Sequence, residues 1–153
     1  MQKKGSATEQ GLGRSRGGFT SKIVLTAADE DTAIAVDVVP GQAHEAAQLE
    51  PILEQTAARV PDMEEVVGDK GFDGDAQRQA CRDHGAKPVI PFKANRTSPG
   101  RLNQKAYRER NKIERLFGKL KEFRRVATRY EKLKQTFLGV IHLVLGFIRL
   151  KRL

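Results

Sequence analysis

Hydrophobic and polar positions recur along this chain in a way that predicts a mixed α/β protein. Two β-branched apolar runs, 19–27 and 33–39, flank the polar stretch 28–32, as in two antiparallel strands joined by a turn. The rest of the pattern predicts, in order, a helix over 45–59, a strand over 64–68, a helix over 73–84 closed by Gly85, a strand over 87–91, a basic loop over 92–102 and helices over 104–124 and 130–150. Strands and helices in this order fit helices packed on a mixed sheet.

The C-terminal apolar run from Phe137 to Ile148 predicts a buried helix and no membrane partner. It contains His142 and is shorter than the roughly 20 residues that a spanning helix needs. The single cysteine, Cys81, excludes an internal disulfide and indicates a reducing, cytoplasmic setting.

Charge is divided unevenly along the chain. Residues 1–86 hold 9 Lys and Arg against 15 Asp and Glu, a balance of −6, whereas 87–153 hold 19 against 4, a balance of +15. A basic field of this size attracts a nucleic-acid backbone and makes binding depend on salt. A solvated basic face and ribosomal-type RNA binding remain alternatives on charge alone.

Four reactive side chains share one face of the helix expected over 104–124. At 100° per residue, Tyr107, Arg110, Glu114 and Lys121 fall within an arc of about 60°. A neighbouring arc is apolar and is expected to pack on a core; it holds Ile113, Leu116, Phe117, Leu120 and Phe123. Glu114 is therefore expected to lie beside the buried stripe and to be incompletely solvated.

Glu114 has two interpretations on spacing alone. Arg110 precedes it by four residues, which is common in surface ion-pair lattices. A second acidic site favours a catalytic role for Glu114 over a surface ion pair. Asp69 follows the strand expected over 64–68, and the glycines that flank it allow backbone or a ligand to approach closely. Carboxylates from a strand end and a helix can share a Mg²⁺ site that activates a phosphodiester.

These residues resemble a known family. The set Tyr107, Arg110, Glu114 and Lys121 fits the Y-x2-R-x3-E-x6-K signature of DDE-class bacterial insertion-sequence transposases. Residues 68–73 (GDKGFD) are similar to the segment that carries the second catalytic aspartate of that family. Further similar segments occur in the expected order at 13–19, 40–44, 88–91 and 124–130. The resemblance covers roughly residues 11–150.

The resemblance implies a ribonuclease-H-like fold, a mixed sheet with flanking helices, that lacks its first strand. The family carries three catalytic carboxylates, the first on a strand upstream of the segment that 13–19 resembles. Residues 1–18 contain only Glu9 as an acid and show no strand pattern, while Asp29 and Asp31 fall in the expected turn. We therefore expect a flexible basic, Gly-rich segment over 1–18 and a truncated catalytic domain over 19–153.

The resemblance also implies roles for individual residues. Asp69 and Glu114 are the implied catalytic and metal-binding carboxylates, with Mg²⁺ as cofactor and Mn²⁺ as its substitute. The residues expected to bind DNA phosphates are Tyr107, Arg110, Lys121, Lys70, Arg124 and Arg125. The implied reaction is metal-dependent cleavage of a phosphodiester at an element end, followed by strand transfer. With one catalytic aspartate absent, we expect the chain to be inactive on its own.

The implied partners are DNA, at element ends and target sites, and either an N-terminal transposase fragment or a full-length transposase. A homo-oligomer is expected for the active complex. The alternative function is a non-catalytic DNA-binding remnant that occupies DNA or a partner transposase without cutting.

Overall fold

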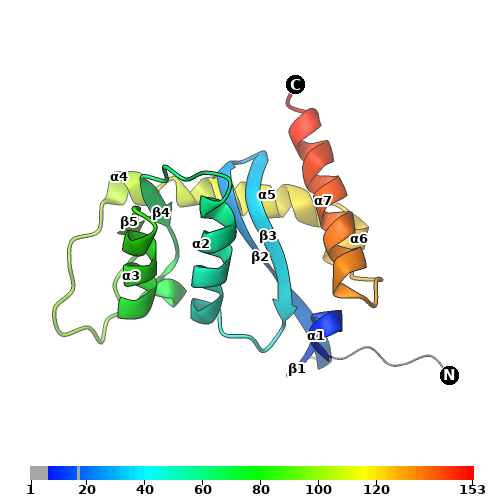
Figure 1. Cartoon of the computed structure of the whole chain (residues 1–153), viewed down its shortest axis with the longest axis horizontal. Helices are drawn as coiled ribbons and strands as arrows, with labels where there is room; N and C mark the ends of the chain where they lie inside the picture. Colours follow the sequence, from blue (N-terminus) through cyan, green and yellow to red (C-terminus); the bar gives the residue numbers. More distant parts are fainter. Residues whose placement is uncertain (1–6, 17) are drawn as a thin grey trace.

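The computed structural model describes residues 7–16 and 18–153, which form short helices and two small sheets (Figure 1). The elements are α1 (Ala7–Gln10), β1 (Gly13–Ser15), β2 (Gly18–Asp29), β3 (Thr32–Pro40), η1 (Ala46–Gln48), α2 (Leu49–Ala57), β4 (Glu65–Val67), η2 (Lys70–Phe72), α3 (Asp75–Asp83), β5 (Lys87–Val89), α4 (Gln104–Tyr107), α5 (Arg110–Lys121), α6 (Arg124–Ala127) and α7 (Lys134–Leu150). The mixed α/β class predicted from the sequence is confirmed.

The first sheet is antiparallel, in the order β1-β2-β3. β2 and β3 form the predicted hairpin, and at its turn the Asp29 Oδ1 accepts a hydrogen bond from the Asp31 N–H at 2.9 Å. The turn role predicted for Asp29 and Asp31 is therefore confirmed. The segment 1–18, which shows no strand pattern, contains α1 and β1 in its described part, and β1 pairs with the start of β2.

The second sheet is a parallel pair, β4 and β5, with α3 as the connection between them. α3 stops at Asp83, and Gly85 follows with φ +77°, a left-handed conformation that glycine adopts without strain. The sequence predicts one mixed sheet, whereas the structure has two sheets. No hydrogen-bonded ladder joins β2 to β4 among the described residues, because a cavity separates their edges.

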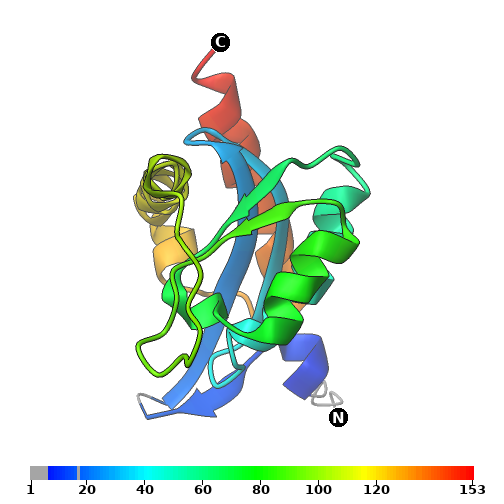
Figure 2. The ribbon, with the colours of Figure 1, turned by 90° about the vertical axis from the view of Figure 1, so that its left-hand side faces the viewer.

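Apolar side chains gather in two clusters, one for each sheet. Leu25, Val36 and Val38 of the hairpin pack with Leu116 and Leu120 of α5 and with the buried face of α7. The second cluster joins α2, α3 and the residue that follows β5 through Leu49, Leu53, Ala80, Cys81 and Ile90. Figure 2 shows α5 on one side of the strands and α2 with α3 on the other.

The terminal helix α7 is amphipathic. It buries Phe137 and Ile141 in the first cluster and exposes Leu143 and Leu150, whose side chains are 76% and 65% exposed. None of the described helices combines the length and the apolar content that a membrane span requires.

Candidate functional site

Asp69 lies where β4 ends. It is the N-cap of η2, in an extended conformation (φ −81°, ψ 174°), and its Oδ1 accepts a hydrogen bond from the Gly71 N–H at 2.7 Å. A Cβ on residue 71 would lie 2.9 Å from Asp69 Oδ1 and 3.1 Å from Glu45 Oε2, so glycine leaves the room that two carboxylates need. The structure thus places Asp69 at a strand end beside permissive glycines, as the sequence predicts.

Glu114 lies near Asp69, and Arg110, the first residue of α5, contacts both carboxylates. Arg110 Nη1 lies 2.7 Å from Glu114 Oε1, and Arg110 Nη2 lies 3.9 Å from Asp69 Oδ2. The ion pair that the four-residue spacing suggests is therefore present, but the same guanidinium also faces a second carboxylate. The side chain of Glu114 is 57% exposed, so its loss of solvent beside the apolar stripe is only partial.

Tyr107 does not share a helix with these residues. The sequence predicts one helix over 104–124, but α4 ends at Tyr107 and α5 begins at Arg110. The N–H groups of Glu109, Asn111 and Lys112 bond to carbonyls three residues back instead of four, which tightens the chain at this junction. The 100° spacing that aligned Tyr107 with Glu114 therefore does not apply across the break.

Four of the predicted phosphate-binding side chains lie outside the Asp69–Glu114 pair. Lys70 is exposed in η2, next to Asp69. Lys121 ends α5 seven residues after Glu114, which places it about 10 Å along the helix axis. Arg124 is exposed at the start of α6, whereas Arg125 Nη2 binds Glu131 Oε1 at 2.5 Å. The structure brings Arg110 to both carboxylates, whereas Lys121, Arg124 and Arg125 lie beyond them, at the end of α5 and in α6.

Asp69 and Glu114 line a cavity of about 640 Å³ between the two sheets. Most of its lining is apolar, and it is bounded by β2, α2, β4 and α5. Seven acidic side chains reach this cavity against three basic ones: Glu45, Asp62, Glu64, Glu65, Asp69, Glu109 and Glu114 against Lys22, Arg110 and Lys112. The site is thus an acidic concavity in a strongly basic protein. Five of these acids, Glu45, Asp62, Glu64, Glu65 and Glu109, carry no signal in the sequence pattern. Glu45 approaches Gly71 together with Asp69 although it lies 24 positions before Asp69 along the chain.

A buried ion network fixes the segment that follows Asp69. The carboxylate of Asp73 has no exposed side-chain surface and pairs with Arg78 at 2.8 Å and Arg96 at 2.9 Å. It also accepts a hydrogen bond from the Lys93 N–H at 2.7 Å, and Arg78 donates to the Ile90 carbonyl at 2.8 Å. Burial raises the pKa of Asp73, but these donors outweigh it and lower the pKa to about 2. Asp73 is therefore ionised at neutral pH and joins η2, α3 and the loop after β5.

The residues at Asp69 fit a divalent cation that is shared with a ligand. Among residues 7–16 and 18–153, no three His, Cys, Asp or Glu side chains are grouped so that they could hold a metal ion. Mg²⁺, however, is commonly bound by one or two carboxylates together with water and substrate phosphates. Asp69 and Glu114 already converge on one cationic group, Arg110, so this is a place where the fold accommodates positive charge between two carboxylates.

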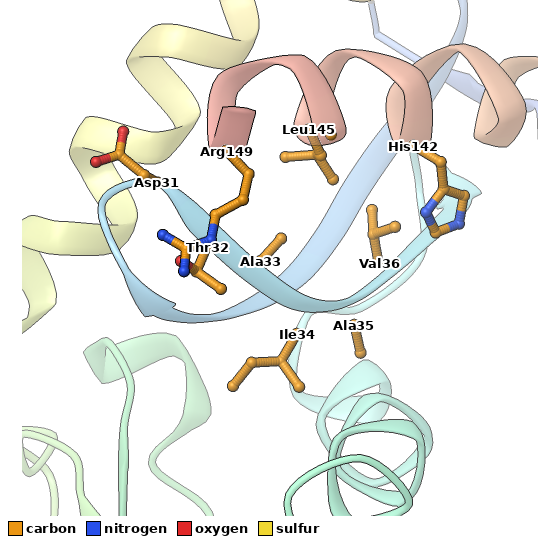
Figure 3. A pocket seen from close by; sticks show the side chains of 10 residues that line it. Asp31, Thr32, Ala33, Ile34, Ala35, Val36, His142, Leu145 and Arg149 are labelled. Atoms are coloured by element: carbon orange, nitrogen blue, oxygen red, sulfur yellow. The ribbon is translucent and has the colours of Figure 1, made fainter. Parts of the chain in front are cut away.

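A second cavity, of about 250 Å³, lies between β3 and α7 (Figure 3). His142 and Arg149 of α7 and Thr32 of β3 border it, and the Asp31 carboxylate points away toward α5. Asp31 there pairs with Lys119 at 2.5 Å. This cavity shares neither Asp69 nor Glu114 with the larger one and gathers no comparable set of carboxylates.

Comparison with known proteins gives two similarities. A family model described as "Transposase DDE domain" matches residues 66–151, a region that starts in β4 and contains Asp69, Arg110 and Glu114. A protein of Brucella ovis, named as a transposase for insertion sequence element IS6501, is 35% identical over 88 residues. That alignment covers 56% of this chain and 67% of the Brucella protein. No solved structure matches the chain.

Proposed function

Since the chain belongs to the DDE transposases of insertion sequences, we propose that it serves the metal-dependent cleavage of phosphodiester bonds at element ends and the joining of the freed strand to target DNA, with little or no activity on its own. Asp69 and Glu114 are the proposed catalytic and metal-binding carboxylates, and the proposed cofactor is Mg²⁺ with Mn²⁺ as a substitute. The observation that carries the assignment is the convergence of these two carboxylates, from a strand end and a helix, on Arg110.

In the proposed site, the two carboxylates would hold a metal ion, and the neighbouring basic side chains would position the DNA phosphates. A divalent cation between Asp69 and Glu114 would supply Lewis-acid polarisation of the scissile phosphate and activation of the attacking oxygen. Arg110 offers a planar fork that matches phosphate oxygens as well as carboxylates, so it can hold the scissile phosphate close to both acids. The exposed Lys70 beside Asp69 adds a mobile positive charge for a flanking phosphate.

For the fold, we propose a ribonuclease-H-like domain over residues 19–153. In this proposal the β2–β3 hairpin and the β4–β5 pair are two parts of one sheet, flanked by α2 and α3 on one face and by α5 and α7 on the other. Lys121, Arg124, Arg125 and Tyr107 are proposed to follow the DNA away from the carboxylates, because α4, α5 and α6 carry them in sequence.

Metal binding tests the site assignment directly. Titration with Mn²⁺, followed by electron paramagnetic resonance, should show a bound ion that is lost in Asp69→Asn and Glu114→Gln. Glu122→Gln is the matched control, since Glu122 is an exposed acid just after the end of α5 and does not line the cavity. Unchanged Mn²⁺ binding in both site variants would overturn the assignment.

Cleavage is then measured on a supercoiled plasmid that carries the element ends. We expect at most weak Mg²⁺- or Mn²⁺-dependent nicking by the purified chain, and none by Asp69→Asn or Glu114→Gln. Strong nicking that survives both substitutions would contradict the proposed reaction.

A DNA-binding function without cleavage is the second candidate. It is favoured by the charge of +15 over residues 87–153 and by the exposure of Lys121 and Arg124. It predicts retention on DNA at low salt, release at moderate salt and no effect of EDTA. Filter binding with and without EDTA distinguishes it from a metal-dependent complex.

A further inference from the structure

The terminal helix α7 has a second apolar face, opposite the face that packs on the hairpin. Its inner face buries Phe137 and Ile141 in the first cluster. The outer face carries Leu143, Phe147 and Leu150, which are 76%, 48% and 65% exposed. Figure 1 shows α7 toward one end of the molecule, far from α3. Single exposed apolar residues are ordinary, but a row of them along one helix marks a surface for contact with another chain.

The outer face of α7 has the spacing of a coiled-coil seam. Thr136, Gly139, Leu143, Gly146 and Leu150 follow one another at intervals of three, four, three and four residues, and all five are exposed. Residues at this spacing occupy the a and d positions of a heptad, which turn together toward a partner helix. Along this seam of α7, leucine and glycine alternate.

The two glycines of the seam are open toward the outside. A Cβ built at Gly139 or at Gly146 would meet no atom within 4 Å. Glycine inside a helix is unfavourable relative to alanine, and packing within the described fold does not require it at either position. A second helix that approaches closely does require small residues, because its own side chains need holes to enter.

The seam is complementary to a second copy of itself in the antiparallel orientation. When Leu143 of one helix lies opposite Gly146 of the second copy, the same register places Leu150 opposite Gly139. Each leucine then meets a glycine, as a positions meet d positions in an antiparallel pair. A parallel pair would set leucine against leucine and glycine against glycine, which leaves gaps at the glycines. A contact made by the same surface on both copies closes on itself and gives a dimer.

We propose that α7 pairs with α7 of a second copy of this chain, antiparallel about a two-fold axis. The exposed parts of Leu143, Phe147 and Leu150 amount to roughly 400 Å² per copy. With the small residues between them, the two copies bury about 1,000 Å², which is the lower limit for a specific interface. We therefore expect a dissociation constant on the order of 10 μM. This inference is independent of whether Asp69 and Glu114 bind metal.

Charge determines how this dimer responds to salt. The chain carries a net charge of +9, and α7 contains no acidic residue. The antiparallel register brings Arg149 and Lys151 of one copy toward the first turn of α7 in the second copy, which begins with Lys134. These like charges repel, and salt screens the repulsion. The dimer should therefore strengthen as salt rises, whereas binding to DNA or to an acidic partner helix weakens.

Sedimentation equilibrium of the whole protein measures the dimer. Between about 2 and about 200 μM we expect a reversible monomer–dimer equilibrium, tighter in about 0.5 M than in about 0.15 M sodium chloride. Leu143→Ala with Leu150→Ala should weaken the dimer about tenfold or more, because both side chains enter the glycine holes. These residues are exposed in the single chain, so the variant should fold normally.

The glycine holes have a matched control on another helix. Gly146→Leu fills a hole and should weaken the dimer about tenfold or more, whereas Gly118→Leu, at an equally open and exposed position of α5, should leave it unchanged. Both substitutions introduce a better helix former, so neither should impair folding. Leu143→Gly combined with Gly146→Leu exchanges large for small and should restore the dimer to within about threefold of the parent.

Disulfide cross-linking tests the antiparallel register. Cys81 is the single cysteine of the chain and is fully buried, so an introduced thiol on α7 is the accessible one. Gly139→Cys mixed with Leu150→Cys should form a mixed disulfide, because these positions face each other. Neither variant should form one with itself, since equal positions lie about 16 Å apart along the axis, beyond the reach of a disulfide.

Three results would overturn the proposal. The first is a protein that stays monomeric at about 200 μM in about 0.5 M salt, well above the expected dissociation constant. The second is a Gly146→Leu variant that dimerises as well as the parent, since that result would place the contact on another face. The third is faster cross-linking of Leu150→Cys with itself than with Gly139→Cys, which would exclude the antiparallel register.

Discussion

Replacing Asp73 by alanine is expected to destabilise the protein more than any single surface change near the site. The Asp73 carboxylate is fully buried and accepts hydrogen bonds from Arg78 Nε at 2.8 Å, Arg96 Nε at 2.9 Å and the Lys93 N–H at 2.7 Å. The side chain of Arg78 is itself only 8% exposed, so Asp73→Ala leaves a buried guanidinium without its counter-ion.

The expected loss follows from the burial of the pair. Breaking a buried ion pair by removing one partner costs about 3–5 kcal/mol, most of it from the charge that stays behind. The Arg78 guanidinium keeps its bond to the Ile90 carbonyl and its stacking on the Phe92 ring, 4.0 Å from the centroid. These contacts do not replace a counter-ion, so we expect a loss of about 4 kcal/mol.

Urea unfolding followed by circular dichroism measures this loss. With a urea dependence of about 2 kcal/mol per molar, Asp73→Ala should lower the midpoint by about 2 M. Asp75→Ala is the matched control, because Asp75 pairs with the same Arg96 but is 90% exposed, and its loss should stay below about 1 kcal/mol. Equal midpoints for the two variants would refute the reasoning that burial, and not pairing as such, sets the magnitude.

Three further predictions concern the pH dependence of Asp73, the packing of α5 and α7, and the contacts with DNA. The lowered pKa of Asp73, about 2 against 3.8, means that its contribution of about 2 kcal/mol is present above pH 4 and is lost as the pH falls toward 2; acid titration of unfolding should show this component in the parent and not in Asp73→Ala. Leu120→Ala, at a fully buried position between α5 and the hairpin, should cost about 2–5 kcal/mol in thermal or urea unfolding, whereas Leu143→Ala on the exposed face of α7 should change stability by less than about 0.5 kcal/mol. In DNA binding, Lys121→Ala and Arg124→Ala should each reduce the slope of log K against log salt by about one, and an unchanged slope would remove these residues from the DNA-binding surface.

The elements that the sequence predicts well are those with a local signal. The β2–β3 hairpin is predicted by two β-branched runs around a polar turn. The end of α3 is predicted by Gly85, because glycine is the residue that adopts a positive φ without strain. The position of Asp69 at a strand end follows in the same way from the glycines on both sides of it.

What the sequence did not reveal depends on contacts between distant residues or on backbone detail. Asp73 and Arg96 are 23 positions apart, and neither pattern nor spacing pairs them. The break between α4 and α5 comes from hydrogen bonds that shorten from four to three residues, with no proline or glycine to announce it. The sequence predicts that Arg125 is available to bind phosphate, but in the structure it forms an ion pair with Glu131.

The separation into two apolar clusters has a consequence for how the chain folds during synthesis. The hairpin and the unit from β4 to β5 each close over neighbouring residues, whereas Arg115 reaches Glu30 across 85 positions. Local pairing precedes long-range closure because the entropy of loop closure is smaller. On the ribosome, Val36 and Val38 are therefore not fully covered until α7, which is made well after β3, has emerged. Emergence of α7, and not formation of the strands, then sets the time at which the hairpin is protected from aggregation.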